Sequence, residues 1–199
     1  PFLDGSERSC EWLIDDAENA LAAVEKLPTL PELAAVEWPK GKSVRVVSLG
    51  PRQLGVLVAD VSGKGTSAAL YMAELKGLML ALSRTHRSPR ALLIELNDLL
   101  ADHLDNRSFI TMTYAVIDLD AATLTCARAG HTPMLVVSGG ESQVVVPDGM
   151  VLGLRLPGAG KRFGEILQEH TQPLHPGDVI VLYTDGITEA MNAENDLFG

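Results

Sequence analysis

The sequence predicts an α+β fold in the form of a layered sandwich. Strand-like runs precede and follow two helical stretches, at residues 67–82 and 88–104, that are adjacent along the chain. Because these helices lie together and do not alternate with strands, a layered α+β sandwich fits better than a parallel α/β sheet. A chain of 199 residues is about the size of one domain, with room for a sizeable core.

The strands are predicted from short apolar and β-branched runs that turn residues separate. Residues 43–49 and 54–59 flank Gly50 and Pro51, which predicts a hairpin of two strands. Further strands are predicted at residues 109–119, 124–129, 134–137, 143–146, 165–170 and 178–184.

Three segments have the pattern of helices. Residues 67–82 are rich in Ala, Leu and Met, and Ser88 and Pro89 open the next helix as its N-cap and first turn. Apolar residues at helical spacing also mark residues 10–27, where prolines then end the pattern. This amino-terminal helix would pack on its own domain or act as a linker, dimer or regulatory helix, because an apolar stripe does not identify its partner.

Charge and hydropathy exclude several classes of partner. The formal net charge is −10, so direct attraction to nucleic acid or anionic lipid is not expected. No apolar run reaches the roughly 18 residues needed to span a bilayer, and the first residues lack the layout of a signal peptide. Cys10 and Cys126 each fit a buried apolar position. We therefore expect a cytoplasmic protein without a membrane or nucleic-acid partner.

Two aspartates occupy positions that suit a divalent cation. Asp60 and Asp185 each follow an apolar strand and are followed by glycine within a few residues. Backbone can approach a ligand closely at such a place, and hard cations such as Mg²⁺ and Mn²⁺ prefer carboxylate oxygens. Alternatively, each aspartate only organises its own turn, as Asp commonly does. The spacing alone leaves both interpretations open.

Four sequence blocks resemble one known family. D-V-S-G-K-G at residues 60–65 resembles the D-x-S-G-K-G signature of SpoIIE/RsbU-type phosphatases, a bacterial branch of the metal-dependent phosphatase 2C superfamily. T-D-G-I-T-E-A at residues 184–190 resembles the family's T-D-G-x-x-E-A signature. F-I-T at residues 109–111 and A-G-H-T-P at residues 129–133 resemble its F-x-T strand and A-G-H-x-P turn. Together, in this order, the four blocks make the resemblance specific.

The resemblance implies a phosphatase 2C-like β-sandwich flanked by helices, with two Mn²⁺ or Mg²⁺ ions at one end. Asp60 would bridge both ions, the carbonyl of Val61 would complete one site, and Asp185 would hold the other ion. Asp60 and Asp185 are thus the expected catalytic residues. Lys64 would contact phosphate or remain a solvated turn lysine, and His131 fits a structural turn residue better than a metal ligand.

Two positions depart from the family pattern near the expected metals. The family carries another acidic ligand before Asp60, in a G-G-D-[YF]-[YF]-D motif, and a gapless count puts Lys42 at that ligand and Arg45 at the motif's last aspartate. Replacing a carboxylate by an ammonium changes the local charge by two units, and each unit is worth roughly 4 kcal/mol at about 4 Å with an effective dielectric of about 20. One ion, or none, is then expected, with Lys42 and Arg45 pairing with Asp60 or Asp185 instead.

The family also has a further helix and a final strand, with another metal-binding Asp, beyond the point that matches Gly199. Residues 28–199 are therefore expected to form a SpoIIE-type phosphatase domain without that carboxy-terminal part, and residues 1–27 an amino-terminal helix.

The leading interpretation is metal-dependent dephosphorylation of phosphoserine or phosphothreonine on a bacterial regulatory protein, of the anti-sigma-factor antagonist type that the resemblance implies. The alternative is a catalytically dead pseudophosphatase, a signalling module that binds a partner protein. Asp60 and Asp185 favour the first, whereas Lys42 and Arg45 favour the second. A homodimer formed through helices is compatible with both.

Overall fold

The computed structural model describes residues 42–50, 52–63, 65–155 and 158–188. These residues form two β-sheets and a set of helices, which confirms the predicted α+β sandwich. In this part of the chain, no helix is both long and apolar enough to cross a membrane. The helix predicted at residues 10–27 lies outside the described residues.

The larger sheet has five antiparallel strands in the order β1-β2-β3-β4-β7, and the smaller sheet has three in the order β6-β5-β8. The first two strands form the predicted hairpin. The strands of the larger sheet are β1 (Lys42–Gly50), β2 (Gln53–Val61), β3 (Ile110–Asp118), β4 (Thr123–Ala129) and β7 (Glu169–Pro173). Those of the smaller sheet are β5 (Met134–Ser138), β6 (Glu141–Val145) and β8 (Val179–Val181).

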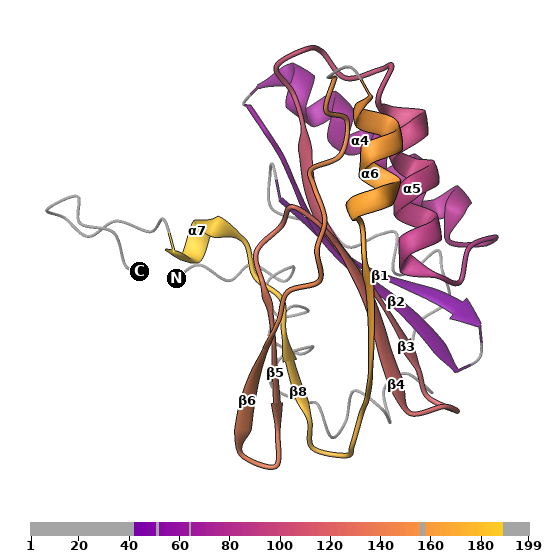
Figure 1. The fold of residues 1–199 in the computed structure, drawn as a ribbon, viewed down its shortest axis with the longest axis vertical. Coiled ribbons are helices and arrows are strands. Elements are labelled where there is room, and N and C mark those ends of the chain that lie inside the picture. The colour runs from indigo at the N-terminus through magenta and orange to yellow at the C-terminus, as the bar shows by residue number, and fades with distance from the viewer. Residues whose placement is uncertain (1–41, 51, 64, 156–157, 189–199) are drawn as a thin grey trace, which may run out of the picture.

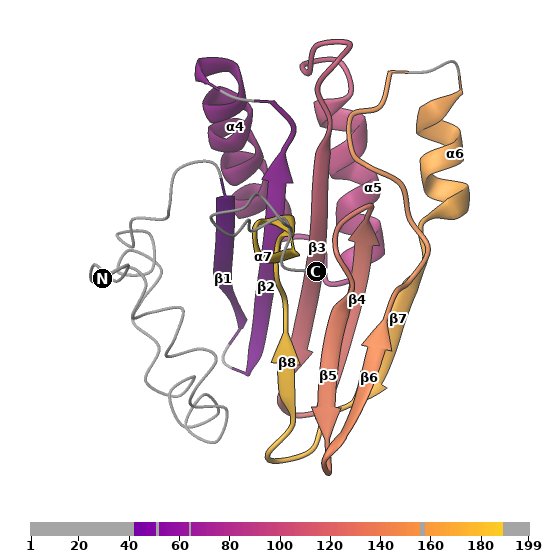
Figure 2. The same cartoon turned by 90° about the vertical axis from the view of Figure 1, so that its left-hand side faces the viewer.

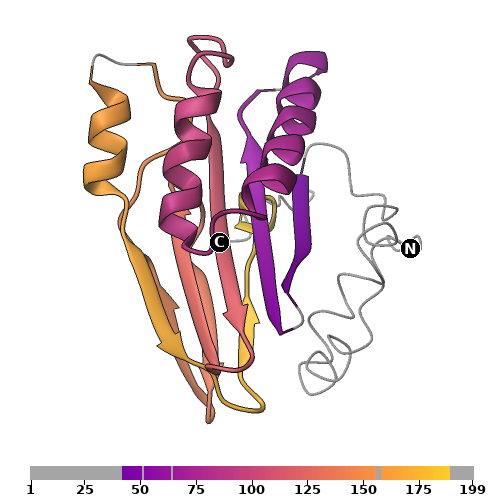
Figure 3. The same cartoon turned by 90° about the vertical axis from the view of Figure 1, so that its right-hand side faces the viewer.

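Helices cover one face of the larger sheet, and the smaller sheet covers the other face (Figure 1). The covering helices are α4 (Thr66–Leu82), α5 (Pro89–Leu100) and α6 (Ala159–Ile166). Figure 2 shows the three-stranded sheet in front of the five-stranded one, and Figure 3, from the opposite side, shows the three helices in front. The single-turn helix α7 (Asp185–Thr188) follows β8, on the side away from α4, α5 and α6.

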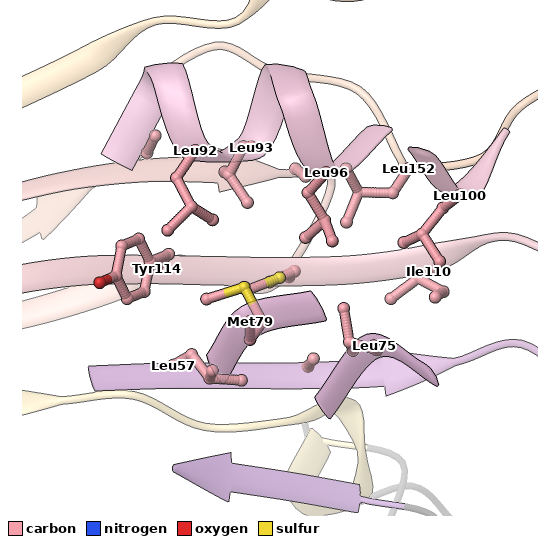
Figure 4. Close-up of a cluster of buried hydrophobic side chains, with 14 of the residues drawn as sticks. Leu57, Leu75, Met79, Leu92, Leu93, Leu96, Leu100, Ile110, Tyr114 and Leu152 are labelled. Atoms are coloured by element: carbon pink, nitrogen blue, oxygen red, sulfur yellow. The ribbon is translucent and has the colours of Figure 1, made fainter. Parts of the chain in front are cut away.

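The main core lies between the larger sheet and its helices. Alternate residues of β3 point to opposite faces, as the period of a strand requires. Ile110, Met112 and Tyr114 therefore pack toward the helices, whereas Ala115 packs toward the smaller sheet. Figure 4 shows the leucines of α5 against β3 and α4. These fully buried leucines are Leu92, Leu93, Leu96 and Leu100.

Tyr114 fits into this core because β2 has a glycine beside its ring. A Cβ atom on Gly55 would lie 2.7 Å from the hydroxyl oxygen of Tyr114, closer than real Cβ atoms approach. Burial raises the pKa of Tyr114 to about 12, so the phenol stays neutral in the folded protein at physiological pH.

A second, smaller cluster fills the space between the two sheets. It includes Cys126 of β4, which is 1% exposed, so the prediction of a buried cysteine in a strand is confirmed. Cys10 lies outside the described residues. The other fully or nearly buried members are Ala115, Leu124, Met134, Val136 and Val145.

The predicted helix starts agree with the structure, whereas the second helix ends at Leu100 and not at residue 104. The stretch predicted at residues 67–82 is α4, and the N-cap of α5 is Ser88, as predicted. The Ser88 hydroxyl oxygen accepts a hydrogen bond from the Ala91 amide at 3.1 Å and donates one to the Glu169 carboxylate at 2.6 Å. This cap therefore also joins α5 to β7.

The strand predicted at residues 165–170 is wrong in its first part. Residues Ala159–Ile166 form α6, and the strand β7 begins only at Glu169. The buried residues of α6 are Ala159 and Phe163, four positions apart, which is helical spacing. This pair of apolar residues is the sequence pattern that marks α6 as a helix.

The strand predicted at residues 178–184 is shorter than expected. β8 comprises only Val179–Val181, and residues 182–184 have no regular structure before α7 begins at Asp185. Asp185 therefore does not directly follow a strand, and other contacts must hold the segment that carries it.

Candidate functional site

Asp60 is the penultimate residue of β2 and lies on the sheet face toward the smaller sheet. Leu57, Ala59 and Val61 belong to the helix-facing core, so the strand period places Asp60 on the opposite face. Asp60 is half-buried, and it pairs with Thr111 of β3. Its position is therefore fixed within the ladder of the larger sheet, at the edge of the space between the sheets.

The turn after Asp60 is bound to the start of β3 through Ser62. The Ser62 amide donates to the Phe109 carbonyl at 2.9 Å, and the Ser62 hydroxyl oxygen accepts from the Phe109 amide at 2.8 Å. Gly63 and Gly65 have φ angles of 94° and 85°, the left-handed region that favours glycine. No other described group lies within 4 Å of where their Cβ atoms would be. The turn is therefore held at one end through Ser62, and the described residues leave free space around its glycines.

The A-G-H-T-P turn lies against the start of β3. The Thr111 hydroxyl and Nδ1 of His131 are 2.9 Å apart, and His131 is buried. The guanidinium of Arg128 donates to the His131 carbonyl at 2.8 Å. Gly130 forms an isolated bridge with Met112. These are the contacts of a residue that organises a turn, which is the role predicted for His131.

Thr132 joins this turn to the segment that carries Asp185. Its hydroxyl donates a hydrogen bond to the carbonyl of Tyr183, two residues before Asp185. Asp185 is half-buried and is the first residue of α7. A continuous series of contacts thus runs from β2, through β3 and the turn, to the segment after β8. Figure 2 shows β8 and α7 in front of the larger sheet, on the side of the smaller sheet.

The structure describes the strand positions of two of the basic candidate residues, Lys42 and Arg45, but not that of Lys64. β1 pairs Lys42 with Asp60 and Arg45 with Leu57, so the backbone register places Lys42 opposite the candidate metal ligand. Residues directly opposite in an antiparallel pair share a face of the sheet. Lys64 lies outside the described residues.

The donor set can be compared with the needs of a divalent cation. The carboxylates of Asp60 and Asp185 and the carbonyl of Val61 are hard oxygen donors, and the glycines of the turn after Asp60 have no other described group within 4 Å of where a Cβ atom would be. Mg²⁺ is commonly held by one or two carboxylates and several waters, so the chemical types of these donors suit one hydrated ion. Among the described residues, no group of three or more His, Cys, Asp or Glu side chains could hold a metal ion. The donors described are therefore too few for a pair of ions.

Sequence reasoning assigned no role to three hydroxyl residues that connect the parts of this site. They are Ser62, Thr111 and Thr132, and each one bonds a residue from a different block or strand. All three lie inside the sequence blocks that resemble the family. This position could have identified them, because such a block can contain residues that connect it to other parts of the site in addition to ligands.

The sequence has relatives of known type. The family model of stage II sporulation protein E (SpoIIE) matches residues 50–199. Phosphoserine phosphatase RsbU of Bacillus subtilis (strain 168) is 36% identical over 138 residues, which is 68% of this chain and 39% of RsbU. The chain thus spans well under half the length of this relative.

Solved structures share the fold. The PP2C phosphatase domain of SpoIIE from Bacillus subtilis matches with a TM-score of 0.64 at 20% identity, over 77% of this chain and 44% of that one. RsbX, solved in complex with magnesium, matches with a TM-score of 0.59 at 19% identity, over 77% of this chain and 70% of that one. Both confirm the predicted phosphatase 2C-like fold. Since the family model covers more than half of the sequence, the chain belongs to the SpoIIE family.

Proposed function

We propose that this domain dephosphorylates phosphoserine or phosphothreonine on a regulatory protein in a metal-dependent reaction. The observation that carries the proposal is the series of contacts between the strand of Asp60 and the segment of Asp185. Two carboxylates that are 125 residues apart in the sequence, one in β2 and the other in the segment after β8, are connected through the same turn. Aspartates that only organised their own turns would not require such a connection.

In this proposal the protein supplies oxygen ligands and a fixed geometry. Asp60, the carbonyl of Val61 and Asp185 would hold Mn²⁺ or Mg²⁺ at the open side of the glycine turn. A cation bound there would supply an activated water and offset the charge that develops on the phosphoryl oxygens. Asp60 is held by pairing on both sides of β2, so it can orient a ligand with little rearrangement.

The substrate class follows from the family. RsbU, the relative with 36% identity, is named as a phosphoserine phosphatase, and we extend that activity to this chain. We further propose that the substrate is a phosphorylated regulatory protein of the anti-sigma-factor antagonist type, and that the domain works in the cytoplasm.

The second candidate function, a pseudophosphatase, is favoured by one specific observation. The hairpin register pairs Lys42 with Asp60, and Lys42 is the residue that the gapless count put in place of an acidic ligand. An ammonium group at that position would repel a divalent cation. The repulsion would cost on the order of 4 kcal/mol per unit of charge at an effective dielectric of about 20. A domain with this substitution would bind its partner without hydrolysing phosphate.

The two functions can be separated by a phosphatase assay with excess Mn²⁺ on a phosphoserine peptide. Wild type is compared with Lys42→Asp, which restores a carboxylate, and with Lys42→Met, which removes the charge without adding a ligand. We expect measurable wild-type hydrolysis that ends when the metal is chelated, and at least about tenfold higher activity in Lys42→Asp, since outer ligand partners alone change activity by 10–100-fold.

The results of this assay separate the phosphatase from the pseudophosphatase. Metal-dependent activity in wild type excludes the pseudophosphatase. Activity in Lys42→Asp alone means that an otherwise competent site has lost a ligand, and the wild type is then the pseudophosphatase. If none of the three proteins hydrolyses the peptide and calorimetry detects no Mn²⁺ binding to any of them, the phosphatase proposal fails.

A further inference from the structure

The A-G-H-T-P turn is held more firmly than its lack of regular structure suggests. The Arg128 guanidinium donates to the His131 carbonyl at 2.8 Å, and the His131 ring contacts the Thr111 hydroxyl at 2.9 Å. Gly130 has a φ angle of 66°, and a Cβ atom there would lie 2.6 Å from Cγ1 of Val151. The backbone of the turn is therefore fixed from several sides by the larger sheet and the segment after β6.

The segment that carries Asp185 has less support from regular structure. β8 has three residues, and its described pairing is with β5 on one side. The chain leaves the sheet after Val181, four positions before Asp185. In this interval the Tyr183 carbonyl accepts a hydrogen bond from the Thr132 hydroxyl. A side chain on the fixed turn thus binds the backbone of a segment that lies outside the strands.

We infer that Thr132 is a positioning residue for the metal site. Its hydroxyl fixes the Tyr183 carbonyl and thereby sets where Asp185 stands relative to Asp60. Thr132 and Tyr183 are 51 residues apart in the sequence, and Thr132 is not itself a metal ligand in this inference. The inference rests on the proposed function, because it assumes that Asp60 and Asp185 hold a common cation.

The test measures Mn²⁺ affinity by calorimetry in wild type, Thr132→Val and Thr132→Ser. Valine keeps the shape of threonine and removes the hydroxyl, whereas serine keeps the hydroxyl. We expect Thr132→Val to bind Mn²⁺ about tenfold more weakly, the lower end of the range for partners that orient metal ligands, and Thr132→Ser to bind like wild type. Excess Mn²⁺ should restore most of the activity of Thr132→Val, since the ligands themselves remain.

A matched control is available in the same fold. The hydroxyl groups of Thr125 and Thr171 are 3.0 Å apart across β4 and β7, away from the turn. Thr125→Val is the same substitution and removes a hydroxyl hydrogen bond, here an exposed one between two side chains, so it should leave Mn²⁺ affinity unchanged. Thermal melts of all variants separate a loss of stability from a loss of metal affinity, and Thr132→Ala replaces Thr132→Val if the latter does not fold.

A second readout needs no metal. Amide hydrogen exchange at residues 183–185 of the metal-free protein should be faster in Thr132→Val than in wild type and unchanged in Thr125→Val. If wild type binds no Mn²⁺, the proposed function fails, while faster exchange in Thr132→Val still supports the positioning role. Unchanged exchange in Thr132→Val, or equal Mn²⁺ affinity in Thr132→Val and wild type, overturns the inference. A Thr132→Ser protein as weak as Thr132→Val also overturns it, because the hydroxyl would then not be the cause.

Discussion

β2, which carries Asp60, has nine residues and is paired with β1 on one side and β3 on the other. β8, which precedes Asp185, has three residues and a described pairing with β5 alone. Leu57 of β2 is 2% exposed in the main core, whereas every residue of β8 is only half-buried. The two candidate ligands are therefore supported by regions of very different packing.

This difference separates two ways of fixing a ligand. The backbone at Asp60 is fixed by strand pairing, which any sequence with suitable alternation can form. The backbone before Asp185 lies outside the strands and accepts a side-chain hydrogen bond from Thr132. Regions with few buried contacts open more easily than core strands. We therefore expect motion of the segment that carries Asp185, more than motion of β2, to limit how well the two carboxylates are positioned.

The largest expected effect comes from removing each carboxylate in turn. Asp60→Asn should lower Mn²⁺-dependent phosphatase activity by at least about a hundredfold, because loss of a partner that merely orients a ligand already costs 10–100-fold. Asp185→Asn should lower it as well, but higher Mn²⁺ should recover part of the activity. The measurement is the hydrolysis rate of a phosphoserine peptide over a Mn²⁺ titration.

The control for both variants is Asp118→Asn, a carboxylate at the far end of β3 that accepts from Gln53 and from the Ala121 amide. It should keep wild-type activity. Full activity in Asp60→Asn would contradict the assignment of Asp60. Equal recovery of Asp60→Asn and Asp185→Asn by Mn²⁺ would remove the proposed difference between the two sides.

An intermediate effect is expected from truncating one apolar residue in each region. Leu57→Ala should lower the free energy of unfolding by about 3 kcal/mol, the usual range for a buried leucine. Ile180→Ala of β8 should lower it by about 1 kcal/mol, because the side chain is half-buried and loses less contact. Urea unfolding monitored by circular dichroism measures both, and equal values would mean that the two regions pack equally well.

The well-packed region is also the one that the sequence predicted accurately. The hairpin of β1 and β2, the helix α4 and the N-cap Ser88 follow from local patterns, namely β-branched runs around a turn, a stretch rich in Ala, Leu and Met, and a capping residue before proline. The gapless count put Lys42 at the position of an acidic ligand of the family, and the hairpin register pairs this residue with Asp60.

The errors lie where local patterns are short. α6 was not predicted, and its last two residues were assigned to a strand, because eight residues with two buried positions, Ala159 and Phe163, give a weak periodic signal. β8 was predicted too long because the run through Tyr183 and Thr184 is apolar and β-branched, although its end leaves the sheet. The link from Thr132 to Tyr183 joins residues 51 apart, and no local pattern can reveal such a contact.

The smallest expected effect concerns Cys126, which lies between the two sheets with Ile180 packed against the same cluster. Burial, with a smaller contribution from the Glu169 carboxylate, raises the pKa of the Cys126 thiol to about 11 from its usual value near 9. The folded protein therefore keeps the thiol protonated and unreactive, and labelling by a thiol reagent at pH 8 must proceed through opening. As the pH rises from about 9 to 11, the unfolded state loses this proton first, so stability should fall in that window.

Labelling of Cys126, in a Cys10→Ser background, shows which region opens. If the smaller sheet opens on its own, Ile180→Ala should speed labelling about fivefold, the change that 1 kcal/mol produces in an equilibrium, while Leu57→Ala should leave the rate nearly unchanged. If opening requires global unfolding, Leu57→Ala should instead have the larger effect, in proportion to its loss of stability. The second result would mean that both sheets form one cooperative unit, and that the segment before Asp185 is as firmly held as the strand that carries Asp60.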